Sequence, residues 1–325
     1  MSSIDRRHFC AALATALVLP RTAWAQTYPT RAIRLVVPYA AGGGTDAIAR
    51  IVAQKVGERL GQTIVVENIG TAGGNVATMT VASATPDGYT MLMANQGPMA
   101  VNPHLFKSLK VDTLKAFDPI TLVASAPLVV VVPEASPCKT LKDLVAEAKK
   151  APGKLNYGSA GNGSASHLAT VLLNLTAKID TVHLAYRGAG PAIVDLLGNR
   201  TQFMVTTIPS VTGLLTSHKL RPLAVTGKTR TPLMKDVPTV AESGYPDYDA
   251  SAWYGFVVPH ETPADVVNIL HKATVEALSD ETVRERLATD GAVPVGNSAQ
   301  EFGAFIKAES ARWKKVIAAA NISVD

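Results

Sequence analysis

Short β-rich runs alternate with helix-like segments along most of the chain, and this alternation limits the folds available to it. Ile33–Val37 predicts a strand, and Thr45–Leu60 predicts a helix with its apolar residues on one face. Strands that alternate with helices indicate an α/β fold with mostly parallel sheets. Further strands are expected at Thr63–Glu67, Tyr89–Ala94, Leu128–Val132, Leu155–Tyr157, Thr181–Leu184, Gln202–Thr206 and Leu220–Thr226. Helices are expected between them at Ser164–Leu175 and Pro191–Leu197.

The expected strands fall into two sets, bracketed by apolar segments. This grouping indicates two lobes joined by two crossings, and a single large sheet is the alternative that periodicity leaves open. On the two-lobed interpretation, residues 26–124 and 228–325 form lobe 1, and residues 125–227 form lobe 2. The segment Thr229–Ser251 is rich in Pro, Gly, Asp and Tyr, and we expect a long ordered connection there.

Local signals predict where three helices begin. Thr140 opens a capping-box pattern, which starts a helix that ends before Pro152. Thr262 is expected to be an N-cap, with Pro263 at the first helical position. A second capping box is expected at Ser298–Glu301.

The first 25 residues have the three parts of a signal peptide. Arg6 and Arg7 precede an apolar run, Phe9–Pro20, and Ala23-Trp24-Ala25 supplies a small-residue cleavage site. We therefore expect export and cleavage after Ala25. The paired arginines resemble a twin-arginine signal, with an ordinary Sec signal as the alternative. The apolar run is too short to span a membrane, and no later segment is long and apolar enough.

Charge and cysteine content exclude several classes of protein. The full chain has 31 Lys+Arg and 26 Asp+Glu. Removal of residues 1–25 takes away three arginines and one aspartate, which leaves 28 and 25 and a net charge of +3. A charge this mild, without a basic run, argues against a nucleic-acid partner. Cys138 is the remaining cysteine, so no intramolecular disulfide can form. The seven histidines show no metal-ligand spacing, and we expect no metal and no cofactor.

Four glycine-rich loops stand where strands are expected to lead into helices. They are Pro38–Asp46, Asn68–Asn75, Tyr157–His167 and Tyr186–Pro191. Glycine lets backbone N–H groups turn toward a ligand, and a helix N-terminus adds a positive dipole end. In open α/β sheets, ligands bind at the carboxyl ends of the strands. Each loop alone is compatible with an ordinary turn, but the four together predict one small anion held from both lobes.

These loops complete none of the common nucleotide-binding or nucleophile motifs. The triple glycine is not followed by the Lys of a Walker A loop, and no G-x-G-x-x-G is complete. Tyr157 stands where a nucleophile elbow around Ser159 would need glycine. Ser164 or Ser166 with His167 could form the nucleophile and base of a hydrolase, which is one alternative to a non-enzymatic binding protein.

Three side chains in these loops have two interpretations each. His167, in the first turn of its expected helix, is either structural or a hydrogen-bonding residue of the site wall. Asp46 is either an N-cap or first-turn carboxylate of the following helix, or it contacts the ligand. Arg187 either pairs a carboxylate bidentately or is solvated at the rim of the site.

Several shorter segments accompany the four loops. They are Tyr28-Pro29, Pro86–Tyr89, Leu220–Val225, Val237–Glu242, Trp253–Gly255 and Glu261–Pro263. In this order and spacing, the loops and segments resemble the Bug (TctC-type) receptors of tripartite tricarboxylate transporters, and the similarity covers nearly the whole mature chain. The resemblance implies a type II periplasmic binding protein fold, with two α/β lobes, mostly parallel sheets and a two-strand hinge. It also implies a periplasmic, non-enzymatic receptor.

The resemblance implies that the ligand is a carboxylate, held largely by backbone N–H groups and water. On the lobe 1 side it points to Tyr39, Gly43 and Gly44. On the lobe 2 side it points to a larger set, namely Gly161, Ser164, Ser166, Arg187, Gly188 and Ala189. Gln96 and Pro98 are expected to line the floor.

One departure from the family pattern concerns Thr206. Many relatives carry an acidic residue where this chain has Thr206-Thr207, and an acidic side chain would pair with the ammonium of an amino acid. Its absence favours a di- or tricarboxylate, aliphatic or aromatic. The resemblance further implies membrane permease subunits as partners, and we expect a monomer. A ligand-sensing accessory of a signalling system is the alternative that the sequence leaves open.

Overall fold

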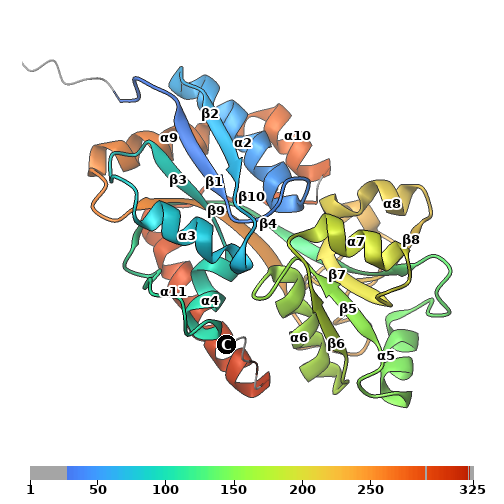
Figure 1. Cartoon of the computed structure of the whole chain (residues 1–325). Coiled ribbons are helices and arrows are strands. Elements are labelled where there is room, and N and C mark those ends of the chain that lie inside the picture. The colour runs from blue at the N-terminus through green and yellow to red at the C-terminus, as the bar shows by residue number, and fades with distance from the viewer. Residues whose placement is uncertain (1–27, 290, 321, 323–325) are drawn as a thin grey trace, which may run out of the picture. The chain divides into compact units, whose positions relative to one another are not determined.

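In the computed structural model, which describes residues 28–289, 291–320 and 322, one long strand joins two lobes (Figure 1). The strand is β4 (Phe117–Pro133), which pairs through its first part with strands of lobe 1 and through its second part with strands of lobe 2. The fold lies within residues 31–325. The predicted signal peptide, residues 1–25, lies outside the described residues.

The sheet of lobe 1 has the strand order β2-β1-β3-β9-β4, with β10 paired to β4. Its strands besides β4 are β1 (Ile33–Val37), β2 (Ile64–Asn68), β3 (Thr90–Asn95), β9 (Ser251–Pro259) and β10 (Val293–Pro294). β1 pairs in parallel with β2 and β3, as the sequence predicts. β9 pairs antiparallel with β3 and β4, because it carries the chain back from lobe 2.

The sheet of lobe 2 continues from β4 in the order β4-β7-β5-β6, and β8 also pairs with β4. These strands are β5 (Asn156–Ser159), β6 (Val182–Ala185), β7 (Phe203–Thr207) and β8 (Leu220–Val225). β5 pairs in parallel with β6 and β7, whereas β7 and β8 pair antiparallel with β4. The prediction of parallel pairing is therefore right for the strands that alternate with helices and wrong for the pairs that β4 and β9 make.

Helices cover the sheets of both lobes (Figure 1). Lobe 1 carries α2 (Gly44–Leu60), α3 (Asn75–Ala82), α4 (Asn102–Leu105), α9 (Ala264–Ser279), α10 (Glu281–Thr289) and α11 (Ala299–Ala320). Lobe 2 carries α5 (Leu141–Lys150), α6 (Ala165–Ala177), α7 (Ala189–Leu197) and α8 (Thr212–Thr216). Single turns lie at η1 (Ala72–Gly74), η2 (Gly97–Val101), η3 (Ile208–Ser210) and η4 (Pro232–Met234). None of the described helices combines the length and the apolar character that a membrane crossing requires.

Each lobe has its own core. In lobe 1, Trp313 and Phe302 of α11 are fully buried with Leu92 of β3. In lobe 2, Leu196 of α7 is fully buried with Val129 of β4. Burial of such large apolar side chains stabilises each lobe by about 1.5 to 3 kcal/mol per side chain. Leu168 of α6, a helix of lobe 2, is also buried in the core of lobe 1, so the two scaffolds that hold the interlobe loops pack against each other.

The structure tests the predicted helix starts. Thr140 makes the expected capping box at the start of α5. Ser298 and Glu301 make the second one, since each backbone N–H donates to the other's side chain. The prediction for Thr262 is wrong, because Pro263 occupies the N-cap position of α9 and the Thr262 hydroxyl donates to the carbonyl of Pro259 at 2.7 Å.

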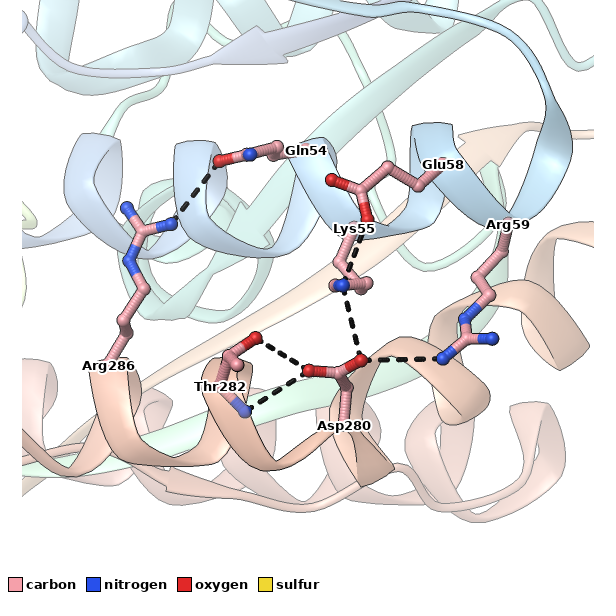
Figure 2. A network of polar contacts seen from close by, with 7 residues as sticks. All are labelled: Gln54, Lys55, Glu58, Arg59, Asp280, Thr282 and Arg286. Carbon is pink, nitrogen blue, oxygen red and sulfur yellow. Dashed lines mark hydrogen bonds and ion pairs between the residues drawn. The ribbon is translucent and has the colours of Figure 1, made fainter.

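A charged network fixes α2 against the start of α10 (Figure 2). The Asp280 carboxylate accepts hydrogen bonds from the backbone N–H and hydroxyl of Thr282, at 3.1 and 2.6 Å. It also pairs with Lys55 at 3.2 Å and with Arg59 at 3.4 Å, both on α2. The Thr282 hydroxyl, followed by Lys55, lowers the pKa of Asp280 to about 2. The C-terminal half of α2 is thereby anchored, while its N-terminus faces lobe 2.

Candidate functional site

A small cavity of about 50 Å³ lies between the lobes, where the loop after β1 meets the ends of β5 and β7. It brings together eight of the residues predicted from the sequence, which are Tyr39, Gly43, Gly44, Gln96, Ser164, Ser166, Ala189 and Thr206. Among the described residues, no Asp, Glu, Lys, Arg or His lines it. The polar atoms of its wall are therefore hydroxyls, carboxamides and backbone groups. These neutral groups can donate hydrogen bonds to an anion without placing a second charge in the cavity.

The lobe 1 wall is built by the loop between β1 and α2. Gly43 is the N-cap of α2, and no side chain caps this helix end. The first turn, with the backbone N–H groups of Gly44 and Thr45, lines the cavity, where a helix N-terminus favours an anion. The backbone N–H of Gly44 donates to the Ser210 hydroxyl of lobe 2 at 3.3 Å, so one of these donors already reaches across the cleft.

Asp46 does not line the cavity. Its carboxylate accepts from the backbone N–H of Gly42 at 3.0 Å and from Arg50 at 2.9 Å. Burial opposes ionisation, but the hydrogen bonds from Arg50 and Gly42 outweigh it and lower the pKa of Asp46. Asp46 thus holds the loop in shape from behind, which places the glycines without taking part in the wall.

The lobe 2 wall is built by the loop between β5 and α6. Ser164 is the N-cap of α6, and its hydroxyl donates to the Gly161 carbonyl at 2.7 Å. The Ser166 hydroxyl lies 3.0 Å from that of Ser164 and accepts from the backbone N–H of Ala160 at 2.9 Å. The two serines therefore order the loop and also present their oxygen atoms at the cavity wall.

The back wall comes from the ends of β3 and β9. Tyr39 donates to the side-chain oxygen of Asn95 at 3.4 Å, and burial raises the pKa of this phenol. Trp253 and Tyr254 of β9 line the same side of the cavity. The indole N–H of Trp253 donates to Glu309 of α11 at 3.2 Å, so the orientation of this ring is fixed from outside the cavity.

Several wall residues were not predicted from the sequence. They are Asn95, Thr207, Ser210, Trp253 and Tyr254. The segment Trp253–Gly255 was recognised as part of the family pattern, but no role was attached to it. Thr207 directly follows the predicted Thr206 at the end of β7. The departure from the family pattern covers both threonines, but it predicts a site role only for Thr206.

A second, adjoining cavity of about 180 Å³ is lined by two more predicted residues, Gly161 and Arg187. It shares Tyr39 and Ala160 with the first cavity and is lined on its lobe 1 side by the loop after β2. Arg187 belongs to the fourth glycine loop and is exposed there. The second and fourth glycine loops therefore face each other beside the first cavity.

The remaining predicted residues line neither cavity. Pro98 lies in η2 and packs against Gly74, where an added Cβ would be 2.9 Å from the Pro98 ring. Gly188 is buried against Ala40 of lobe 1, with 3.2 Å between an added Cβ and the Ala40 side chain. His167 lines a groove on the other side of its loop. These residues support the walls of the site.

The two lobes touch through glycine backbones. A Cβ on Gly44 would lie 2.6 Å from the Thr207 hydroxyl, which is closer than real Cβ atoms approach. A Cβ on Gly97 would lie 2.7 Å from the Gly163 carbonyl oxygen. Side chains at these positions would hold the lobes apart. The glycines thus permit the close approach of the lobes as well as exposing backbone N–H groups.

The site lacks the pair of groups that a serine hydrolase needs. The Nδ1 atom of His167 accepts from the backbone N–H of Gly163 at 3.1 Å, and its ring stacks on His183 at 4.0 Å. Burial, followed by the neighbouring His183, lowers the pKa of His167 to about 3. A different serine, Ser159, lies 2.6 Å from His183, but its side chain is fully buried and lies outside the cavity. No serine at the cavity wall therefore has a histidine base.

Comparison with known proteins places this arrangement in a wider group. Residues 48–322 match the profile described as the tripartite tricarboxylate transporter family receptor, TctC. The periplasmic binding protein BugD is 35% identical, and the match covers 91% of this chain and 100% of that chain with a TM-score of 0.87. An R. palustris protein solved with adipate is 32% identical, with 91% and 100% covered and a TM-score of 0.88. MatC from Rhodopseudomonas palustris, solved with malate, is 32% identical, with 89% and 100% covered and a TM-score of 0.85.

Proposed function

This chain belongs to the TctC family of tripartite tricarboxylate transporter receptors, and we propose that it captures a small carboxylate between its lobes for uptake by such a transporter. Its fold is that of the two-lobed periplasmic binding proteins. The family and the structural neighbours are periplasmic transport receptors and not enzymes.

One observation carries the proposal, namely that the walls of the interlobe cavity offer donors from both lobes and no charged side chain among the described residues. The first turn of α2 offers backbone N–H groups from lobe 1 besides that of Gly44, which already donates to Ser210. From lobe 2, Ser166 offers a hydroxyl, whereas the Ser164 hydroxyl already donates to the Gly161 carbonyl. A carboxylate that bonds to both walls favours the closed arrangement over the open one. Release remains feasible because no buried counter-charge has to be left unpaired.

The ligand class follows from what the walls lack. An amino acid would leave its ammonium without a carboxylate partner, since Thr206 and Thr207 stand at the end of β7. Arg187, in the adjoining cavity, supplies a cation for a second carboxylate of the same ligand. The structural neighbours solved with adipate and malate hold ligands of this class. The ligand is thus a di- or tricarboxylate, aliphatic or aromatic.

The predicted site residues divide into two groups under this proposal. The contact group lines one of the two cavities and consists of Tyr39, Gly43, Gly44, Gln96, Gly161, Ser164, Ser166, Arg187, Ala189 and Thr206. The supporting group holds the walls from behind and consists of Asp46, Pro98, His167 and Gly188.

The cellular setting completes the proposal. Residues 1–25 are removed during export, and the mature receptor works in the periplasm as a monomer. Residues 26–124 and 228–325 form lobe 1, and residues 125–227 form lobe 2. In support of this division, β4 changes its partner from β9 to β7 between Pro127 and Leu128, close to the proposed boundary. Permease subunits in the membrane receive the ligand.

The test is a thermal-shift and calorimetric screen of the exported protein against malate, adipate, citrate, phthalate, glutamate and glucose. A ligand at 100 times its dissociation constant stabilises the folded protein by about 2.7 kcal/mol, which a melting curve resolves. We expect stabilisation by one or more of the di- and tricarboxylates. A response to glucose or glutamate alone would overturn the assignment of the ligand class.

A further inference from the structure

The third glycine loop contains the only Asn-Gly pair of the sequence, Asn162-Gly163. In such a pair the backbone nitrogen of the glycine can attack the side-chain carbonyl carbon of the asparagine, because no glycine side chain hinders the approach. A new C–N bond forms, the C–N bond of the side-chain amide breaks, and ammonia leaves with the hydrogen of the glycine N–H. Water then opens the five-membered ring to aspartate or isoaspartate. This modification needs water and no enzyme.

The Asn162 side chain lies where the reaction has room and water. It is half-buried and lines two hollows, the cavity of about 180 Å³ that contains Arg187 and the groove of about 580 Å³ that contains His167. Within the part of the chain that the structure describes, no hydrogen bond holds the carboxamide of Asn162. The side chain is therefore free to turn, and water can reach the ring from either side of the loop.

The backbone holds the pair in an unreactive conformation. Residues 161–164 form a β-turn, closed by the hydrogen bond from the Ser164 N–H to the Gly161 carbonyl at 3.1 Å. Gly163, the third residue of this turn, has a φ of +75°, which identifies a type II turn. In a type II turn the carbonyl oxygen of Asn162, and not the Gly163 nitrogen, lies on the side of the Asn162 side chain. Ring closure therefore requires the peptide plane between the two residues to rotate.

Two contacts keep this peptide plane in place. The Gly163 N–H donates to Nδ1 of His167 at 3.1 Å. The Asn162 carbonyl oxygen lies against the second glycine loop, in lobe 1, where a Cβ on Gly73 would be 2.7 Å from it. Because a peptide group is planar, rotation breaks both contacts at once. The contact with Gly73 joins the two lobes, so it is lost when the lobes separate, and one of the two restraints is lost with it.

Both products of the reaction alter the ligand site. Among the described residues, Arg187 is the only charged residue that lines its cavity. An aspartate at position 162 adds a carboxylate there, which competes with the second carboxylate of the ligand for this guanidinium. Isoaspartate also lengthens the backbone between β5 and α6 by one carbon atom, which displaces Ser164 and Ser166 from the cavity wall.

We propose that Asn162-Gly163 is a self-modification site, that it converts with age in the open receptor, that ligand-held closure protects it, and that conversion weakens ligand capture. The loss of capture rests on the proposed function, whereas the conversion itself does not. A receptor that is mostly loaded keeps its affinity, and one that is mostly empty loses it with time.

The first experiment follows conversion by peptide mass spectrometry during incubation of the exported protein near neutral pH. One sample is ligand-free, and the other contains malate, or adipate if the wild type binds that instead. At 100 times the dissociation constant only about 1% of the receptor is ligand-free, so we expect conversion at Asn162 to slow by about tenfold or more. Asn297-Ser298 is the internal control, because the Asn297 side-chain oxygen accepts from the Leu122 N–H at 2.9 Å.

The second experiment measures the consequence for binding by calorimetry. Asn162→Asp places the product charge directly, and we expect its dissociation constant for the same acid to rise about tenfold. Aged wild-type protein should show the same loss in proportion to its converted fraction. Asn162→Gln has a longer side chain that would have to close a larger ring, so it should keep its own initial affinity through the incubation.

Each part of the proposal has an outcome that overturns it. Conversion of Asn162 no faster than that of Asn297 in the ligand-free sample overturns the modification site. Equal conversion with and without ligand overturns protection by closure, and wild-type affinity in Asn162→Asp overturns the effect on capture. A wild-type protein that binds no carboxylate overturns the proposed function, and its ligand-free sample still tests the modification site.

Discussion

The backbone N–H of Gly44 donates to the hydroxyl of Ser210 at 3.3 Å, which joins the first turn of α2 in lobe 1 to η3 in lobe 2. The Ser210 hydroxyl in turn lies 2.8 Å from that of Thr207 at the end of β7. This chain of contacts crosses the cleft beside the cavity. Closure of the lobes and the shape of the ligand site therefore depend on the same few atoms.

Replacing Gly44 with alanine should obstruct closure. Its Cβ would meet the Thr207 hydroxyl at 2.6 Å, and overpacking of this kind costs about 1 to 3 kcal/mol. We expect ligand affinity to fall about tenfold or more, with little change in the unfolding of the ligand-free protein. Calorimetry and the change in radius of gyration on ligand addition measure both effects.

Gly43→Ala is the control for this substitution. Its Cβ would have Ala40 as its nearest neighbour at 3.9 Å, and its backbone φ of −91° suits any residue. We expect near wild-type affinity and the same compaction on ligand addition. Equal behaviour of the two variants would show that the approach of Gly44 to Thr207 does not govern closure.

Removing the carboxylate of Glu309 should loosen the back wall of the cavity. The buried Glu309 accepts from the indole N–H groups of Trp253 at 3.2 Å and of Trp313 at 3.0 Å. Glu309→Ala leaves two buried donors unpaired, and we expect a loss of about 2 to 5 kcal/mol in the free energy of unfolding. Chemical denaturation measures the loss, and weaker ligand binding should accompany it because Trp253 lines the cavity.

Two further variants separate the hydrogen bonds from the loss of volume. Glu309→Gln keeps one acceptor oxygen, so its unfolding free energy should lie between those of Glu309→Ala and the wild type. Glu276→Ala removes an exposed glutamate and should change stability little. If Glu309→Ala is no less stable than Glu276→Ala, the indole contacts do not contribute to the fold.

The stacked histidines His167 and His183 should make stability depend on pH. Burial holds the pKa of His183 at about 4 and, together with His183, that of His167 at about 3. In the unfolded chain both pKa values return to about 6.5, so the unfolded state binds more protons between pH 6.5 and 4. Stability from these groups is therefore present above pH 6.5 and is lost as the pH falls toward 4.

Denaturation curves at several pH values test this expectation. His183→Gln removes one of the two groups, and the slope of unfolding free energy against pH should decrease by about 1.4 kcal/mol per pH unit below pH 6. His218→Gln serves as the control, because His218 is exposed. Parallel pH profiles for wild type and His183→Gln would contradict the assignment.

Asp280→Asn should weaken the anchor between α2 and α10. The substitution removes the charge that pairs with Lys55 and Arg59, while an amide oxygen can still accept from Thr282. Because the pKa of Asp280 is lowered to about 2, the stability that it contributes is present above its unfolded pKa near 4 and is lost as the pH falls toward 2. We expect a lower melting temperature in dilute buffer and a smaller difference in 1 M salt. A difference that is unchanged by salt would speak against a charge effect.

The parts of the fold that local patterns describe could be predicted from the sequence. β1 has the predicted bounds, and α2 begins one residue before the predicted Thr45. β9 was not predicted, because Ser251–Pro259 is an apolar run without alternation and contains Gly255. Gly255 is needed there because an added Cβ would lie 2.1 Å from the Phe302 ring, a contact between β9 and α11 that no local pattern reveals.

The same division holds for the candidate site. The glycine loops could be found because glycine and a helix start are neighbours in sequence, and Gly43, Gly44 and Ser164 all line the cavity. Ser210 and Trp253 could not be found, because pairing between distant strands brings them to the wall. Asp46 is a third case. It lies in the loop as the sequence predicts, but its carboxylate accepts hydrogen bonds from Gly42 and Arg50 and does not line the cavity.

A cavity whose described walls hold no carboxylate, ammonium, guanidinium or imidazole has a consequence for the conditions in which it works. The wall gains and loses no proton between pH 5 and 8, and no pair of wall charges is screened when salt rises. Only the acid groups of the ligand itself then decide how capture varies with acidity. Salt acts elsewhere, because it screens the pairing that we propose between Arg187 in the adjoining cavity and a second carboxylate of the ligand.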